Sequence, residues 1–173
     1  RRLLATNLDD VTPMNSEIVD KITHNDDLLR AIYDNINREH PQYQSTKYGV
    51  ILECNGNFQG GASVEIKYGG CIYTDLLWIS EEFRGKGYGR AVMNAVHSFG
   101  KSQGCEIATL CTMSFETAVD FYTDKMGYFV DHKTPGYLGG MAECLYLSRD
   151  ISGVPDIDSL VGNIKIMGHN EEL

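Results

Sequence analysis

The segment best suited to chemistry is a loop rich in glycine and basic residues, Arg84-Gly85-Lys86-Gly87-Tyr88-Gly89-Arg90. Its alternating glycines allow the backbone to turn so that several N–H groups point to one spot. The residues after it have helical periodicity, and a helix N-terminus adds about half a positive charge. The spacing therefore predicts an anion site that could hold a pyrophosphate.

Two other phosphate-binding loops fit this segment poorly. A Walker loop needs Ser or Thr after its lysine, whereas Gly87 follows Lys86. A dinucleotide fingerprint has Gly-x-Gly-x-x-Gly at the start of a parallel fold. Here the glycine spacing is even, and the preceding segments predict an antiparallel meander. A tight strand-to-helix turn without a ligand is the remaining structural alternative.

Strands and helices around the loop predict one α/β domain. Residues 16–37 have helical periodicity, with a break at residues 25–27. Strands are expected at residues 2–6, 48–54, 58–68, 71–80, 106–112, 128–130 and 143–148, with a helix after the loop and a short one after Ser114. The strand–helix–strand unit over residues 71–112 predicts a parallel, right-handed crossover.

The length of 173 residues suits one domain, expected at residues 1–150, with a tail at residues 151–173. The tail is expected to be a linker with one further strand at residues 163–167, or to be partly disordered.

Composition limits the class of partner. Lys and Arg number 15 against 24 Asp and Glu, giving a formal net charge of −9, so nucleic acid is not expected as a partner. The acidic surface suits cationic acceptors, and equally suits solubility alone. No apolar run reaches the roughly 20 residues of a membrane span. Five cysteines without a CxxC pair or metal-ligand spacing indicate reduced thiols in a cytoplasmic protein and no metal.

Two motifs together resemble the GNAT superfamily of acyl-CoA-dependent N-acyltransferases. Arg84, Gly87 and Gly89 fill the pattern Gln/Arg-x-x-Gly-x-Gly/Ala, and Leu77 and Ile79 precede it at the family spacing. The second pattern, Ala-x-x-Phe-Tyr-x-x-x-x-Gly-Tyr/Phe, is filled by Ala118, Phe121, Tyr122, Gly127 and Tyr128. The resemblance is strong over residues 48–148.

The resemblance implies an α/β (α+β) fold with a mixed, mostly antiparallel, splayed sheet. About six or seven strands are expected, with one parallel pair and about four flanking helices. Acetyl-CoA, the expected acyl donor, would lie in the opening between the strand that ends at Ile79 and the strand that ends at Thr112. In this fold, residues 33–48 and 132–142 would be lids over the acceptor site.

The resemblance also implies the cofactor-binding residues. The backbone of the strand would pair with the pantetheine arm and the loop would hold the pyrophosphate. The full set is Leu77, Trp78, Ile79, Arg84, Gly85, Lys86, Gly87, Tyr88, Gly89, Arg90, Phe115, Phe121 and Lys125. By alternation, the Trp78 side chain is expected in the core. Phe115 stands where the family often has Asn, so that polar contact to pantetheine is expected to be absent or to be replaced by Ser114 or Thr112.

Two catalytic residues are expected. In the family, a tyrosine at the position of Tyr122 donates a proton to the departing CoA thiolate; the alternative is a core aromatic. Asp75, two residues before Leu77, is the candidate general base for the amine; the alternative is a solvated carboxylate. Its weaker rivals are Glu53, Glu116 and Asp120. Cys111 is expected to be a structural thiol rather than a nucleophile.

The expected function is transfer of an acetyl group from acetyl-CoA to a primary amine of a small molecule, by direct attack in a ternary complex. The alternatives are a protein or peptide N-acetyltransferase and a catalytically weak acyl-CoA sensor. The protein is expected to be a monomer or a homodimer.

Overall fold

A computed structural model of the protein describes residues 26–41, 44–67, 70–156 and 164–168. The chain divides into two compact units, residues 1–39 and residues 40–173. The first contains helix α1, Asp26–Glu39, which ends two residues before Pro41. The expected strand at residues 2–6 and the expected helical residues 16–25 lie outside the described residues.

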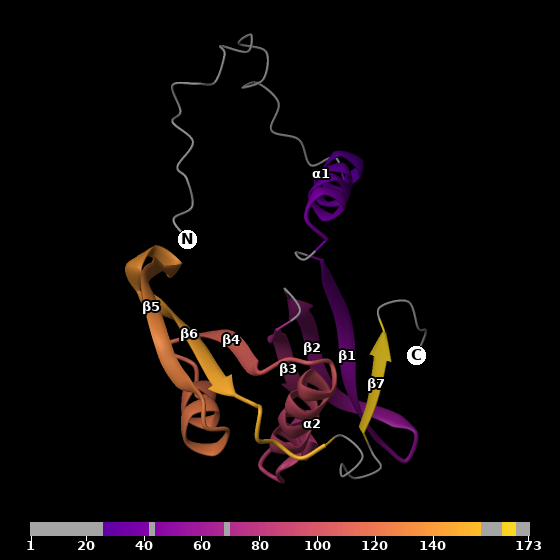
Figure 1. The fold of residues 1–173 in the computed structure, drawn as a ribbon. Coiled ribbons are helices and arrows are strands. Elements are labelled where there is room, and N and C mark those ends of the chain that lie inside the picture. Colours follow the sequence, from indigo (N-terminus) through magenta and orange to yellow (C-terminus); the bar gives the residue numbers. More distant parts are fainter. Residues whose placement is uncertain (1–25, 42–43, 68–69, 157–163, 169–173) are drawn as a thin grey trace. The chain divides into compact units, whose positions relative to one another are not determined.

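The second unit is built on a seven-stranded sheet in the order β5-β6-β4-β3-β2-β1-β7 (Figure 1). Its strands are β1 Ser45–Cys54, β2 Asn57–Lys67, β3 Cys71–Ile79, β4 Ile107–Met113, β5 Phe129–Tyr137, β6 Ala142–Asp150 and β7 Ile164–Gly168. Only the β3–β4 pair is parallel among the described strands. The expected mixed, mostly antiparallel sheet with one parallel pair is therefore confirmed.

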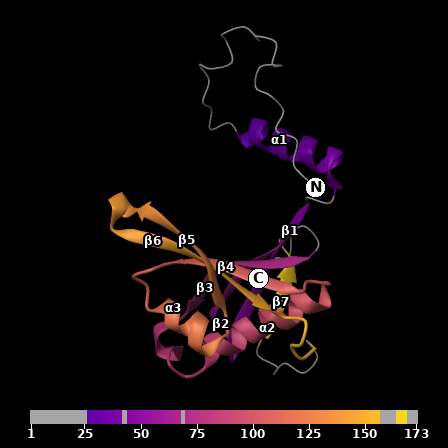
Figure 2. The same cartoon turned by 60° about the vertical axis from the view of Figure 1, so that its left-hand side comes forward.

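The helices of this unit follow β3 and β4. Helix α2, Tyr88–Ser102, lies across one face of the sheet, and α3, Ala118–Asp120, continues directly into the π-helix η5, Phe121–Lys125 (Figure 2). Two 3₁₀ turns, η4 at Glu81–Phe83 and η6 at Leu138–Gly140, complete the elements. The regular helix expected after Ser114 is thus replaced by a single α-turn and a wider π-turn. No helix among the described residues is long and apolar enough to span a membrane.

The parallel pair is short, and this decides where the sheet opens. β3 and β4 pair over four rungs, from Cys71↔Ile107 to Thr74↔Leu110. A bulge follows on β3, because Val64 of β2 pairs with Thr74 while Ser63 pairs with Leu76. Asp75 is therefore an additional residue in the strand. The bulge shifts the alternation, so that Leu77 and Ile79 continue the face of Ile72 and Thr74.

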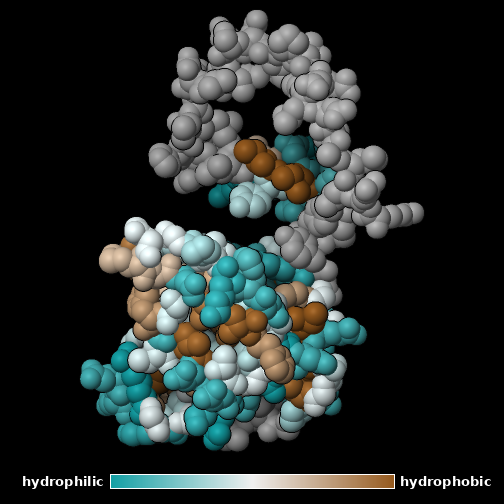
Figure 3. Space-filling model, turned by 90° about the vertical axis from the view of Figure 1, so that its left-hand side faces the viewer, coloured by the Kyte–Doolittle hydropathy of each residue, from teal (hydrophilic) through white to brown (hydrophobic). Residues whose placement is uncertain are grey.

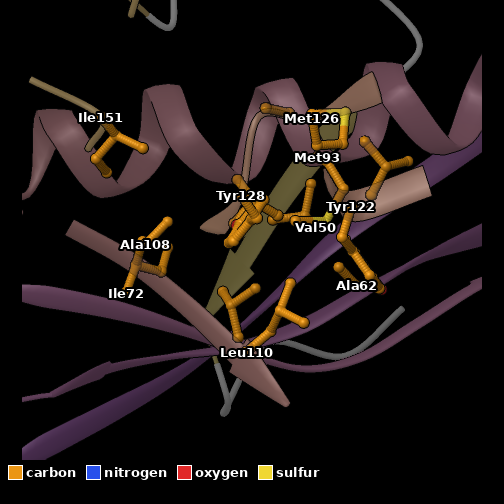
Figure 4. Packing of buried hydrophobic residues seen from close by; sticks show 14 of the residues in the cluster. Val50, Ala62, Ile72, Met93, Ala108, Leu110, Tyr122, Met126, Tyr128 and Ile151 are labelled. Atoms are coloured by element: carbon orange, nitrogen blue, oxygen red, sulfur yellow. The ribbon is translucent and has the colours of Figure 1, made fainter. Parts of the chain in front are cut away.

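The hydrophobic core fills the space between α2 and this face of the sheet. Val92, Met93 and Val96 of α2 are completely buried among apolar side chains from the strands. Tyr122 and Met126 join the same cluster from the η5 turn (Figure 4). The core thus holds the η5 turn that carries Tyr122, strand β3 and helix α2 in fixed positions relative to one another.

Residues 132–137, which lie in one of the two segments expected to be lids, belong to β5, and the β5–β6 hairpin closes at Tyr137↔Ala142. Pro135 lies at the irregularity between Thr134 and Tyr137 of this edge strand, where the register with β6 skips it. The expectation for Trp78 is wrong: it is not in the core, because its side chain is 50% exposed and stacks on Phe58 with ring centroids 5.9 Å apart.

A buried polar network ties α2 to β6 and to the end of η5. Arg149 Nη1 donates to His97 Nδ1 at 3.3 Å and to the Met126 carbonyl at 2.5 Å. Because arginine only donates, Nδ1 accepts and the His97 proton lies on Nε2, which donates to Tyr128 Oη at 2.8 Å. Burial, and then the charge of Arg149, lowers the pKa of His97 to about 3.

This network makes stability depend on pH. Below pH 6.5 the unfolded chain protonates His97, whereas the folded chain holds it neutral down to about pH 3, so stability falls as the pH decreases through this window. We expect His97 to contribute about 2 kcal/mol to the loss of unfolding free energy between pH 7 and pH 5.

Urea unfolding at the two pH values measures this contribution. His97→Gln should lose less stability than the wild type over this interval, whereas the exposed His132→Gln should follow the wild type. Equal losses in the wild type and His97→Gln would contradict the assignment.

Candidate active site

A cleft of about 630 Å³ lies between the open edge of β3, the glycine-rich loop and the η5 turn. It is lined by Leu77, Ile79, Arg84, Gly85, Gly87, Gly89, Arg90, Thr117, Ala118, Phe121, Tyr122 and Lys125. This volume lies within the usual range for small-molecule sites. Nine of the thirteen predicted cofactor residues, and Tyr122, therefore lie around one space.

The backbone of β3 presents hydrogen-bonding groups to this cleft. The Ser80 N–H donates to the Gln59 carbonyl of β2 at 2.9 Å, and Gly60 pairs with Ile79. Because antiparallel pairs alternate between bonded and non-bonded, the Ile79 and Leu77 backbone groups point away from β2. β4 does not cover that edge, because its pairing ends at Thr74. An extended ligand with amide groups could add to this edge as a strand does.

The loop turns because two of its glycines adopt positive φ, 71° at Gly85 and 89° at Gly87. The first helical bond of α2 runs from the Ala91 N–H to the Gly87 carbonyl, at 3.0 Å. The N–H groups of residues 88–90 therefore precede the intrahelical ladder and are available to an anion. This geometry agrees with the predicted pyrophosphate site.

Arg84 joins the loop to the strand. Its Nε donates to the Ile79 carbonyl at 2.9 Å, and that carbonyl is one of the groups turned toward the opening. Arg90 and Lys125 also line the cleft, so three cationic side chains surround a space that already carries the positive end of α2. The electrostatics favour an anionic ligand in spite of the acidic chain.

Four predicted cofactor residues do not line the cleft. Trp78 lies on the opposite strand face, and Phe115 is 62% exposed on the turn after β4. Lys86 Nζ lies over the Phe83 ring, 5.7 Å from its centroid, and Tyr88 packs edge-on against the same ring. Thr112 and Ser114, considered as polar substitutes, are engaged: Thr112 donates to Glu116 Oε2 at 2.5 Å, and Ser114 Oγ accepts from the Glu143 N–H at 3.1 Å.

Tyr122 lies at the inner wall of the cleft and is 8% exposed. Its ring makes edge contacts with Phe121 and Tyr128, at centroid distances of 5.1 and 5.9 Å. Burial, and then the negative charge of Glu116, raises the pKa of Tyr122 to about 12. The phenol is therefore uncharged at neutral pH and has a proton that it can donate in a hydrogen bond.

Asp75 is exposed and lies at the bulge where β3 leaves β4. Its neighbour on the face away from α2 is Tyr73, whose Oη lies 3.3 Å from Cys111 Sγ across the parallel pair. Burial first, then Cys111 and Asp75, raises the pKa of Tyr73. The candidate base thus stands at the closed end of the opening.

Thr117 and Ala118 line the cleft but were not among the predicted cofactor residues. Ala118 belongs to the second motif, so its signal was present in the sequence. Thr117 directly precedes that motif and had no pattern of its own.

A mixed sheet opened beside its parallel pair, with an N–H-rich loop at the open strand, is the arrangement of the GNAT acyltransferases. The sequence matches the Acetyltransferase (GNAT) family over residues 14–128. The chain belongs to this family.

Solved structures agree with this assignment. An acetyltransferase from Bacillus cereus is 18% identical, with 72% of this chain and 90% of that chain aligned and a TM-score of 0.58. An aminoglycoside 6′-N-acetyltransferase complexed with coenzyme A is 16% identical, with 75% and 90% aligned and a TM-score of 0.58. The aminoglycoside 6′-N-acetyltransferase from Enterococcus faecium is 17% identical, with the same coverage and a TM-score of 0.57. No curated protein matches the chain.

Metal ligands do not gather in the described part of the chain: it contains no group of three or more His, Cys, Asp or Glu placed to hold a metal ion.

Arg84→Met tests how the loop is held. Because the variant loses the bond from Nε to the Ile79 carbonyl, we expect the free energy of unfolding to fall by about 1 kcal/mol. Lys86→Met removes a neighbouring charge that makes no such bond, and should change stability by less than about 0.5 kcal/mol. Urea unfolding measures both; equal effects of the two substitutions would contradict this role of Arg84.

Proposed function

We propose that the protein transfers an acetyl group from acetyl-CoA to a primary amine of a small molecule, by direct attack in a ternary complex. The observation that carries this proposal is the single cleft that joins the open edge of β3, the N–H groups of the loop and Tyr122. Each part matches one part of the donor. The backbone amides of β3 match the amide groups of pantetheine, the positive potential at the loop matches the pyrophosphate, and the Tyr122 phenol matches the thioester sulfur.

The donor would lie with its pyrophosphate at the N-terminus of α2 and its pantetheine along Leu77 and Ile79. The bulge at Asp75 and the loop lie toward opposite ends of this part of β3. A pantetheine arm that starts at the loop and follows the strand therefore brings the thioester toward Asp75. The coenzyme A bound to the related aminoglycoside 6′-N-acetyltransferase supports this choice of donor. Lys125 and Arg90 would contact phosphate groups.

In the reaction, the neutral amine nitrogen attacks the thioester carbon and the bond from carbon to sulfur breaks. Asp75, directly or through water, would remove a proton from the ammonium before attack. A free N–H on the β3 edge would stabilise the developing oxyanion. Holding both substrates in one complex supplies much of the rate.

Tyr122 would donate a hydrogen bond to the departing sulfur. With a pKa of about 12, the phenol stays protonated throughout the working range of pH. Complete transfer to a thiolate with a pKa of about 8.5 is uphill by roughly 5 kcal/mol, so the hydrogen bond, rather than a full proton transfer, is the main contribution. The final proton on the thiol then comes from solvent.

The names of related structures support the proposed class of acceptor. Two related structures are named aminoglycoside 6′-N-acetyltransferases, which favours a small-molecule amine. A protein or peptide acceptor is the alternative within the class, and an acyl-CoA sensor is the alternative outside it. A sensor would bind acetyl-CoA without releasing thiol in the presence of any amine.

Tyr122→Phe tests the role of the phenol. We expect kcat to fall about tenfold or more, with little change in the affinity for acetyl-CoA, because the lost bond forms only as the thiolate departs. Continuous thiol release measures kcat, and calorimetry measures affinity. Tyr48→Phe, whose ring packs on Phe99, is the matched control. An unchanged kcat with chemistry rate-limiting would remove this role.

Asp75→Asn tests the base. We expect kcat/KM for the amine to fall about tenfold to a hundredfold at pH 7, with partial recovery at high pH, where more of the amine is already neutral. Glu106→Gln, at the opposite end of the parallel pair, is the control carboxylate. A pH profile of Asp75→Asn parallel to the wild type would instead assign the role to another group, with Glu116 tested next.

A further inference from the structure

A row of hydroxyl and thiol groups crosses the sheet on the face away from α2. Tyr73 of β3 contacts Cys111 of β4 at 3.3 Å. Cys144 of β6 lies near Cys111, because Cys111 contributes to the raised pKa of the Cys144 thiol. The side chains of Tyr146 and of Tyr137 from β5 lie near Cys144 and near each other, because Tyr137 and Cys144 both contribute to the raised pKa of Tyr146. We call these five residues the tyrosine row; it connects side chains from four strands.

The row begins where the sheet opens. Tyr73 and Cys111 flank the last rung of the parallel pair, Thr74↔Leu110. Thr74 and Leu110 are buried toward the core, whereas Tyr73 and Cys111 occupy the alternating positions on the other face. A donor in the cleft and an acceptor on the row would therefore meet at the closed end of the same opening.

Tyr73 and Tyr146 are uncharged at neutral pH. Burial first, with Cys111 next, raises the pKa of Tyr73, and the neighbouring Tyr137, followed by Cys144, raises the pKa of Tyr146 to about 12. Asp75 is the carboxylate whose charge acts on Tyr73. Two ion pairs lie nearby: Lys67 Nζ, 4.0 Å from the centroid of the Tyr73 ring, pairs with Glu65 at 3.2 Å, and Lys133 pairs with Glu143 at 4.0 Å. Because the charges of each pair balance, the carboxylate of Asp75 supplies the net negative charge at this end of the row, which matches a ligand with a single ammonium group.

At the hairpin end of the row, aromatic and apolar side chains are exposed together. Large side chains around the end of the β5–β6 hairpin are exposed: Tyr137 36%, Tyr146 40%, Leu138 60%, Phe115 62% and Met141 84%. Phe115 belongs here because its neighbour Ser114 donates its N–H to the Glu143 carbonyl of β6 at 2.9 Å. Figure 3, which views the side that carries β5 and β6, shows brown hydrophobic residues among the hydrophilic ones. Exposed apolar groups gathered beside an opening mark a binding surface.

We propose that the tyrosine row is the acceptor subsite and that it takes a primary monoamine with a flat, uncharged aromatic body. This inference rests on the proposed function. The ammonium group would lie at Asp75, and the aromatic ring would lie against Tyr146 and Tyr137, where ring pairs stabilise binding beyond the gain from burial alone. A polyamine would place further charges against neutral phenols and apolar side chains, where nothing compensates their desolvation.

The transfer balances as follows. The amine nitrogen forms a bond to the acetyl carbon, and the bond from that carbon to the CoA sulfur breaks. The ammonium group loses two protons in total: one leaves through Asp75 to solvent, and the other is balanced by the proton that the CoA thiolate takes up. No oxidant, metal or further reactant is required.

The test uses the full chain with saturating acetyl-CoA and measures thiol release with 2-phenylethylamine, n-butylamine, spermidine and a lysine-containing peptide. We expect kcat/KM for 2-phenylethylamine to exceed that for each of the other three by about tenfold or more, which corresponds to about 1.4 kcal/mol. A preference for spermidine or the peptide would overturn the proposed acceptor class while leaving the proposed function standing.

Variants of the row locate the selectivity. Tyr146→Ala should lower kcat/KM for 2-phenylethylamine by about tenfold and leave n-butylamine within about twofold, whereas Tyr146→Phe should retain most of the preference because it keeps the ring. Phe129→Ala, exposed at the other end of β5, should leave the preference unchanged. Equal losses for both amines in Tyr146→Ala would overturn the assignment of the row. Acetyl-CoA binding without thiol release from any amine would overturn the proposed function itself, and this inference with it.

Discussion

The short parallel pairing of β3 with β4 is the constraint on which the site depends. Four rungs hold the strands together, and beyond Thr74 and Leu110 the edge of β3 has no strand beside it. Backbone groups left without partners in a protein cost about 1–3 kcal/mol each. Ile79 illustrates the point, because its carbonyl is taken by Arg84. A ligand with amide groups would supply hydrogen-bond partners for the free backbone groups of Leu77. Binding of the proposed donor would therefore depend on where the β3–β4 pairing ends.

The chemistry of the site depends on burial more than on charge. Tyr122 is kept protonated because the core surrounds it, and the turn that carries it is fixed from behind by Arg149, which donates to the Met126 carbonyl at the end of η5. His97 and Tyr128 complete this support. The positive groups, in contrast, gather around the loop, where a polyanion would bind. Under the proposed function, the cleft would thus separate a region that holds the donor from a region in which the donor reacts.

The glycine-rich loop and the two motifs could be recognised from the sequence because each consists of neighbouring residues. The order of the strands and helices along the chain was enough to predict the mixed sheet. The tyrosine row was not predictable, since its members come from four strands and meet only through strand register. The bulge at Asp75 also depends on pairing with β2 and left no pattern in the sequence. The prediction that Trp78 lies in the core was wrong because alternation indicates on which face of the strand a side chain lies, but not which residues cover that face.

The central claim is that the opening beside β3 holds acetyl-CoA, and a crystal structure of the protein with acetyl-CoA tests it most directly. The account predicts pantetheine amides hydrogen bonded to Leu77 and Ile79, the pyrophosphate against the N–H groups of residues 88–90, and the thioester within reach of the Tyr122 hydroxyl. A complex in which the donor binds elsewhere, or crystals that stay empty at saturating acetyl-CoA, would contradict it.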